Sequence, residues 1–299
     1  MPEAEIYKAA IEKLCPHAFI VGLLIDSSAV YRAHFDSDRT RTIAERTKAY
    51  ARTLGKLVDI WEIGNEINGE WVGWKSGNSY LEPLVTLEQL TAARERVADG
   101  TLRAFDELKK IIPDAKTALT FFYNDDGENT GWTDDKKSDA AGEIVSYGER
   151  YSMTTWAREQ RPRLPDVDYV WLSYYEDDNE GVLPNRHNKD ITGLVKIMVE
   201  MSNLFKTAQI GFGEIAPQCH YADCKTRKCQ DCKDDQPLFI NNYYVELDTK
   251  IRAALGNPAS GWDKNRNYCG GYFYWYFRQD ANTRTVNALK TAFGKWYKN

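Results

Sequence analysis

Six short apolar runs recur along this chain, and longer segments of helical periodicity lie between them. The apolar runs predict strands at 19–25, 60–66, 116–123, 167–175, 209–215 and 271–277. The amphipathic segments predict helices at 3–14, 40–57, 86–112, 138–161, 189–206, 238–256 and 284–297. Continuous apolar runs are typical of strands that are covered on both faces of a parallel sheet. The alternation therefore predicts an α/β fold, either a (β/α) barrel or a doubly wound sheet.

The alternation has no linker and no internal repeat, which predicts a single domain over residues 1–299 with a Cys-rich insertion at 218–236. No Gly-rich phosphate loop follows the first run, and this weakens the nucleotide-binding version of a doubly wound sheet. An eightfold TIM-type barrel needs two more strand–helix units, and the order of elements places the shortfall ahead of the first helix. The visible strands would then be strands three to eight. The alternatives are a genuinely reduced barrel and a barrel completed by another chain, for example in a homo-oligomer.

The charge and hydropathy of the chain exclude several classes of partner. The 39 Lys and Arg residues against 44 Asp and Glu residues give a net charge of −5, and no basic stripe with interleaved aromatics is present, so we expect no nucleic-acid partner. No apolar run reaches the roughly 18 residues of a membrane span, so we expect no membrane partner. The segment Met1-Pro2-Glu3-Ala4-Glu5 lacks the basic start and the apolar core of a signal peptide.

Two of the apolar runs end in a glutamate. Asn65-Glu66 closes the run at 60–66, and Glu214 closes the run at 209–215. In a (β/α) barrel the carboxyl ends of the strands share one face, where such enzymes keep their chemistry. Enzymes that hydrolyse glycosidic bonds use such a pair of carboxylates.

The segments Gly64-Asn65-Glu66 and, three strands later, Gly213-Glu214 resemble clan A of the glycoside hydrolases. The resemblance covers residues 19–297 and makes 60–66 strand four and 209–215 strand seven. It implies a retaining enzyme on a (β/α)8 barrel that acts on β-linked oligo- or polysaccharides without a catalytic cofactor. The clan places an Arg on strand two, which this chain does not show. A second interpretation is therefore a non-catalytic carbohydrate-binding or scaffold protein derived from such a barrel.

The resemblance also implies residues that contact the sugar. Trp275 in the last run matches the aromatic platform of the clan, and either Tyr174 or Tyr175 matches a Tyr that touches the nucleophile. The residues themselves suggest two further candidates. Trp71 follows the Asn-Glu pair and either lines a sugar subsite or packs in its loop, and Asn124 follows the third run as a candidate hydrogen-bond donor.

The two glutamates take complementary roles in a retaining mechanism. Glu66 is expected to act as general acid and then as base, with a pKa raised by burial or by the other carboxylate. Glu214 is expected to be ionised and to attack the anomeric carbon, with the two carboxyl groups about 5 Å apart. The resemblance implies that Asn65 hydrogen-bonds the sugar 2-hydroxyl. Glu62 lies on the same face of its strand as Glu66, and as a buried carboxylate it needs a partner. It is expected either to orient the site or to pair with a basic residue on one of the absent strands.

Four cysteines follow the Glu214 run in a C-x4-C-x4-C-x2-C pattern, and they are Cys219, Cys224, Cys229 and Cys232. Four clustered thiolates hold a structural zinc ion, or they form two short disulfides. The short Cys229–Cys232 spacing favours zinc, and the kinship with mostly secreted hydrolases favours disulfides. Cys15 and Cys269 are each expected to precede a strand, and a bridge between them would indicate a barrel closed with six strands.

Overall fold

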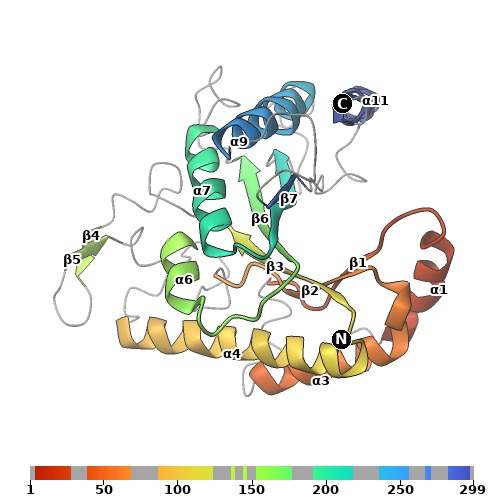
Figure 1. Cartoon of the computed structure of the whole chain (residues 1–299), viewed down its shortest axis with the longest axis vertical. Coiled ribbons are helices and arrows are strands. Elements are labelled where there is room, and N and C mark those ends of the chain that lie inside the picture. The colour runs from red at the N-terminus through yellow and green to blue at the C-terminus, as the bar shows by residue number, and fades with distance from the viewer. Residues whose placement is uncertain are drawn as a thin grey trace, which may run out of the picture. The chain divides into compact units, whose positions relative to one another are not determined.

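The computed structural model describes residues 4–27, 39–68, 87–123, 136–138, 144–146, 153–176, 191–217, 236–255, 267–270 and 282–296 (Figure 1). The main strands are β1 (Val21–Leu23), β2 (Ile60–Gly64), β3 (Lys116–Phe122), β6 (Tyr169–Glu176), β7 (Gln209–Pro217) and β8 (Tyr268–Gly270). The helices are α1 (Ala4–Leu14), α3 (Arg39–Leu54), α4 (Leu87–Ile111), α6 (Met153–Gln160), α7 (Ile191–Leu204), α9 (Asp248–Ala254) and α11 (Thr283–Trp296). Two irregular helices, η2 (Gly55–Leu57) and the π-helical η4 (Asn241–Leu247), adjoin α3 and α9.

The six main strands form one sheet in the order β1-β2-β3-β6-β7-β8. The pairs β1–β2, β2–β3 and β7–β8 are parallel, and helices connect successive strands. Sequence order equals spatial order in this sheet, as in a singly wound barrel rather than a doubly wound sheet, in which the order reverses at a switch point. The predicted α/β class with six strand–helix units is confirmed. No helix in the ranges given above is long and apolar enough to cross a bilayer.

Two elements differ from the sequence prediction. The predicted helix at 138–161 is wrong in its first half, where β4 (Lys136–Ser138) and β5 (Ile144–Ser146) form a small antiparallel pair. The β-branched pair Ile144-Val145 favours a strand, and the helix begins only at Met153. The last strand was predicted at 271–277, a range outside the described residues. The described strand already begins at Tyr268, so Cys269 lies within β8 and does not precede it.

The chain divides into two compact units, which are residues 1–127 with 132–170 and residues 128–131 with 171–299. In the first unit α3 and α4 lie side by side (Figure 1). Its core includes the fully buried rings of Trp61, Phe121 and Trp156. The last two meet edge to face with their centroids 5.6 Å apart, a favourable aromatic geometry that ties α6 to β3.

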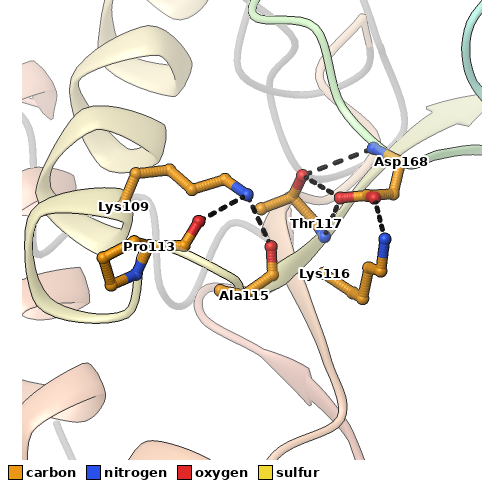
Figure 2. Close-up of polar contacts among 6 residues, drawn as sticks. All are labelled: Lys109, Pro113, Ala115, Lys116, Thr117 and Asp168. Atoms are coloured by element: carbon orange, nitrogen blue, oxygen red, sulfur yellow. Dashed lines mark hydrogen bonds and ion pairs between the residues drawn. The ribbon is translucent and has the colours of Figure 1, made fainter.

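Polar contacts in the first unit fix the amino end of β3 (Figure 2). Lys109, in the last turn of α4, donates to the carbonyl oxygens of Ala115 at 2.7 Å and Pro113 at 3.4 Å, which closes the helix end. Asp168, directly before β6, accepts from the Thr117 backbone N–H at 3.0 Å and from Lys116 Nζ at 2.7 Å. Burial alone would raise the pKa of Asp168, but these hydrogen bonds hold it below its ordinary value. They anchor the segment that leads into β6 to the start of β3.

The second unit has an aromatic core beneath β6 and β7. The rings of Phe239 and Tyr243 lie 4.5 Å apart, and the buried Tyr244 donates to the Ile215 carbonyl oxygen at 3.4 Å. The pairing of β7 with β8 requires a glycine at Gly211. A Cβ at that position would lie 2.3 Å from the Gly270 carbonyl oxygen, much closer than real Cβ atoms approach.

Candidate active site

The turn that follows β2 is built around a close backbone approach at Gly64. A Cβ at this position would lie 2.6 Å from Ile67 Cγ2 and 3.2 Å from Leu119 Cδ2, so no larger residue fits without movement. The pairing of β2 with β3 shifts between Glu62 and Gly64, which is a bulge at the strand end. Bulges re-aim the side chains beside them. The sequence Gly64-Asn65-Glu66 therefore turns sharply where β2 ends.

Glu66 itself occupies the left-handed backbone region, with φ of 45°. A non-glycine residue there carries a strain of about 1 kcal/mol, and it persists only where neighbouring contacts impose it. The two residues after Glu66 make these contacts. Ile67 N donates to the Thr120 carbonyl oxygen at 3.1 Å, and the Asn68 side chain both donates to the Phe122 carbonyl oxygen (2.8 Å) and accepts from the Phe122 N–H (2.7 Å). The turn is thus fixed to the carboxyl end of β3, and Glu66 is held in its strained conformation.

Asn65 is buried, with 3% of its surface exposed, and both ends of its amide have partners. Its Oδ1 accepts from the Ser27 backbone N–H at 3.0 Å, and its Nδ2 donates to Glu62 Oε1 at 3.0 Å. An N–H donor faces one end and a carboxyl oxygen faces the other, so the orientation of the amide is determined by its neighbours. The sequence prediction did not give Asn65 these partners.

Glu66 is half-buried, and one of its carboxyl oxygens accepts a hydrogen bond from a residue in the segment after β1. Ser27 Oγ donates to Glu66 Oε2 at 2.6 Å, a short bond of the kind that hydroxyls make with carboxylates. The strand-end residues of β1 and β2 therefore lie together, as expected for the carboxyl face of a parallel sheet.

Glu62 lies below this pair in the interior, with 8% of its surface exposed. Its Oε1 accepts from Thr120 Oγ1 at 2.5 Å as well as from Asn65. Burial raises the pKa of Glu62 to about 7, and the nearby charges of Glu66 and Asp26 act in the same direction against the two hydrogen bonds. Of the two roles predicted for Glu62, this arrangement matches the one in which it orients the site.

Glu214 belongs to the second unit, where it lies on β7 with 8% of its surface exposed. The strand continues to Pro217, so Glu214 lies within the strand and does not end it as predicted. Tyr174, on β6, is also buried, and its hydroxyl oxygen lies 3.2 Å from that of Tyr243. The contact predicted between a β6 tyrosine and Glu214 stays a prediction.

Several predicted site residues lie outside the described residues, and these are Trp71, Asn124, Cys219, Cys224, Cys229, Cys232 and Trp275. Tyr175 is part of β6, but its side chain is also outside the described set. Within the described residues no group of three or more His, Cys, Asp or Glu side chains is arranged to hold a metal ion. The choice between zinc and disulfides at the four cysteines therefore stays open.

Cys15 and Cys269 are both free thiols, so the bridge that would have indicated a six-stranded closed barrel is not formed. Cys15 lies in the turn after α1, where its thiol contacts the Glu12 carbonyl oxygen at 3.6 Å. Burial raises the pKa of the Cys269 thiol to about 12, which makes it unreactive at neutral pH.

Two residues of the site were missed by sequence reasoning, Ser27 and Thr120. Ser27 follows Asp26 in the polar stretch directly after the apolar run at 19–25. Thr120 is a hydroxyl in an otherwise apolar buried stretch of β3, and such a hydroxyl needs a partner. Both polar residues are visible in the sequence, but the side chains that they contact in the fold lie far away along the chain.

Comparisons with known proteins agree with this geometry at the level of fold. No protein-family model matches the sequence, and no curated protein matches it. Among solved structures, a hyperthermophilic β-glucosidase from Pyrococcus furiosus matches 97% of this chain and 69% of its own, with a TM-score of 0.57 and 15% identity. This chain therefore shares the (β/α) fold of that enzyme over about two thirds of its length. A β-glucosidase from Thermotoga maritima in complex with galacto-hydroximolactam has a TM-score of 0.55 and 12% identity, and it matches 92% of this chain and 68% of its own.

These likenesses confirm the TIM-type architecture predicted for this chain. The AHE enzyme from Alicyclobacillus herbarius is also similar, with a TM-score of 0.54, 11% identity, and coverage of 92% of this chain and 68% of that chain. A further Thermotoga maritima structure is described as a family 1 β-glucosidase. At these identities the likeness extends to the fold alone, so the chemistry has to be argued from the residues.

Proposed function

We propose that this protein is a retaining glycoside hydrolase that cleaves β-glycosidic bonds, with Glu66 as acid and base and Glu214 as nucleophile. The observation that carries the proposal is the clamped Asn65-Glu66 pair at the carboxyl end of β2, in a fold shared with β-glucosidases. A glutamate in a solvated loop would be hydrogen-bonded by water, and no neighbouring contacts would impose a strained backbone on it. Glu214, which is buried on β7, is the proposed second carboxylate.

In the first step Glu214 attacks the anomeric carbon, and the bond from that carbon to the leaving-group oxygen breaks. Glu66 gives its proton to the departing oxygen, so the leaving group departs as a neutral alcohol. The products of this step are a glycosyl ester on Glu214 and an ionised Glu66. The two carboxyl groups act about 5 Å apart in such a mechanism.

In the second step a water molecule gives a proton to the Glu66 carboxylate, and its oxygen attacks the anomeric carbon. The ester bond to Glu214 breaks, which restores the Glu214 carboxylate and the protonated Glu66. Two inversions give net retention. Asn65 is the proposed donor to the sugar 2-hydroxyl, and its fixed amide orientation suits it to that role.

The substrate of the proposed enzyme is a β-linked oligo- or polysaccharide. Aromatic faces stack on the CH surfaces of sugars, and an amide donates to hydroxyls. The proposed contacts are therefore Trp275, Trp71, Asn124 and either Tyr174 or Tyr175. The four cysteines after β7 are proposed to staple the loop at the rim of the cleft, through zinc or disulfides. We also propose a homo-oligomer in which a second copy of the chain supplies further strands and completes the barrel.

The test is azide rescue of two variants on an activated aryl β-glucoside. E66A should lose most of its turnover and regain it with azide, giving the β-glycosyl azide, because the glycosyl-enzyme still forms. E214A should regain turnover only through the α-glycosyl azide, because azide then replaces the nucleophile directly. A wild-type protein that binds β-linked oligosaccharides and hydrolyses none would favour the non-catalytic carbohydrate-binding alternative. Wild-type turnover that survives both substitutions would refute the assignment of both residues.

A further inference from the structure

Ser27 touches both members of the Asn65-Glu66 pair, and it does so with two different atoms. Its backbone N–H donates to Asn65 Oδ1 at 3.0 Å, and its hydroxyl donates to Glu66 Oε2 at 2.6 Å. Only 4% of the Ser27 surface is exposed, so water does not compete freely for the hydroxyl. Removing Oγ would therefore act on Glu66 and leave the backbone contact to Asn65 in place.

We propose that Ser27 is a positioning residue that decides which oxygen of Glu66 carries the proton in catalysis. A serine hydroxyl has a single proton, and here that proton is donated to Oε2. With Oε2 acting as an acceptor, the proton that Glu66 gives and takes resides on the other oxygen, Oε1. This inference rests on the proposed role of Glu66 as acid and base.

The hydrogen bond also makes Glu66 a better acid. Hydrogen bonds to an ionised acceptor are roughly twice as strong as those to a neutral one, so Ser27 stabilises the carboxylate that remains after proton donation. This stabilisation appears as the proton moves from Glu66 to the leaving-group oxygen, and a poor leaving group needs that proton in order to depart. An activated leaving group departs without that proton, so Ser27 should matter much less for it.

The remaining contacts of the turn do not depend on the Ser27 hydroxyl. Asn68 and Ile67 fix the turn to β3, and Glu62 holds the other end of the Asn65 amide. S27A is therefore expected to fold with Asn65 in its native orientation. S27T keeps a hydroxyl at the same position and serves as the conservative variant.

The experiment compares wild type, S27A and S27T on phenyl β-D-glucoside and 2,4-dinitrophenyl β-D-glucoside. For S27A we expect kcat/KM on the phenyl substrate to fall on the order of tenfold, with a much smaller fall on the dinitrophenyl substrate. The alkaline limb of the S27A rate profile should move to higher pH, and S27T should restore both properties. An equal fall on both substrates, with an unmoved pH profile, would overturn the inference.

Two controls separate this inference from loss of stability and from failure of the proposed function. S202A removes another buried serine hydroxyl, one that donates to Asn267 Oδ1 in the second unit, and it should affect both substrates alike. In an E66A background S27A should cause no further loss, because the group it positions is absent. A further loss of the same size would show that Ser27 acts through the fold. Wild-type-like turnover by E66A itself would refute the proposed function, and the inference with it.

Discussion

Replacing Glu62 with glutamine should change how the stability of the protein depends on pH. Burial, with the charges of Glu66 and Asp26, raises the pKa of Glu62 to about 7, against 4.5 for an ordinary glutamate. The folded protein therefore holds this proton more tightly than the unfolded chain does. Its contribution to stability is fully present below pH 4.5 and is lost as the pH rises towards 7. Glutamine keeps an acceptor for Thr120 and Asn65 but carries no proton to lose.

The size of the effect follows from the displacement of the pKa. At about 1.36 kcal/mol for each pKa unit, the rise from 4.5 to about 7 corresponds to a loss of about 3 kcal/mol in the free energy of unfolding. The stability of E62Q relative to wild type should therefore increase by about 3 kcal/mol between pH 4.5 and pH 8.

The assay is urea unfolding followed by tryptophan fluorescence, at half-unit intervals over that range. E107Q is the matched control, because Glu107 is a partly exposed glutamate on α4 whose pKa is lowered by the hydrogen bond from Lys110. That variant should leave the slope between pH 4.5 and 7 unchanged. A difference between E62Q and wild type that stays constant with pH would show that Glu62 is ionised in the folded protein throughout, which would refute the reasoning.

Urea unfolding of three further variants tests the turn after β2 and the contact between Asp168 and Lys116. E66G should be more stable than E66A by about 1 kcal/mol, because only glycine relieves the left-handed backbone at this position; equal stabilities would mean that the turn is unstrained. G64A should lose about 1 to 3 kcal/mol, because its Cβ would overlap Ile67, and an unchanged midpoint would contradict the close approach. D168N should lose about 1 kcal/mol at pH 7. That difference should fade as the pH falls through the lowered pKa of Asp168, whereas a loss that grows towards acid pH would contradict its pairing with Lys116.

The predicted fold followed from features that are local in sequence. Apolar runs of strand length and amphipathic helices such as α4 and α11 carry their own periodicity, so their order and type were predicted almost throughout. The error at 138–161 arose because a short strand pair carries too few residues to show its period. The predicted last strand omits Tyr268 because the apolar run at 271–277 begins only after Cys269 and Gly270.

The candidate site was predicted less completely than the fold. The strand-end position of Asn65-Glu66 follows from the run before it, and the parallel pairing of β1 with β2 was expected. The positive φ of Glu66 and the hydrogen bonds from Ser27 and Thr120 were not, because each depends on residues that only folding brings together. The raised pKa of Glu62 has the same origin, since burial and neighbouring charge are properties of the fold.

The most direct test of the central claim is to trap the glycosyl-enzyme with 2,4-dinitrophenyl 2-deoxy-2-fluoro-β-D-glucoside and to map the labelled peptide. The fluorine slows both steps, and the activated leaving group lets the first step outrun the second. The proposed mechanism predicts one sugar per chain, attached to Glu214, with labelling abolished in E214A and still present in E66A. A label on any other residue, or turnover of the parent glucoside without a trapped intermediate, would contradict a retaining mechanism with Glu214 as its nucleophile.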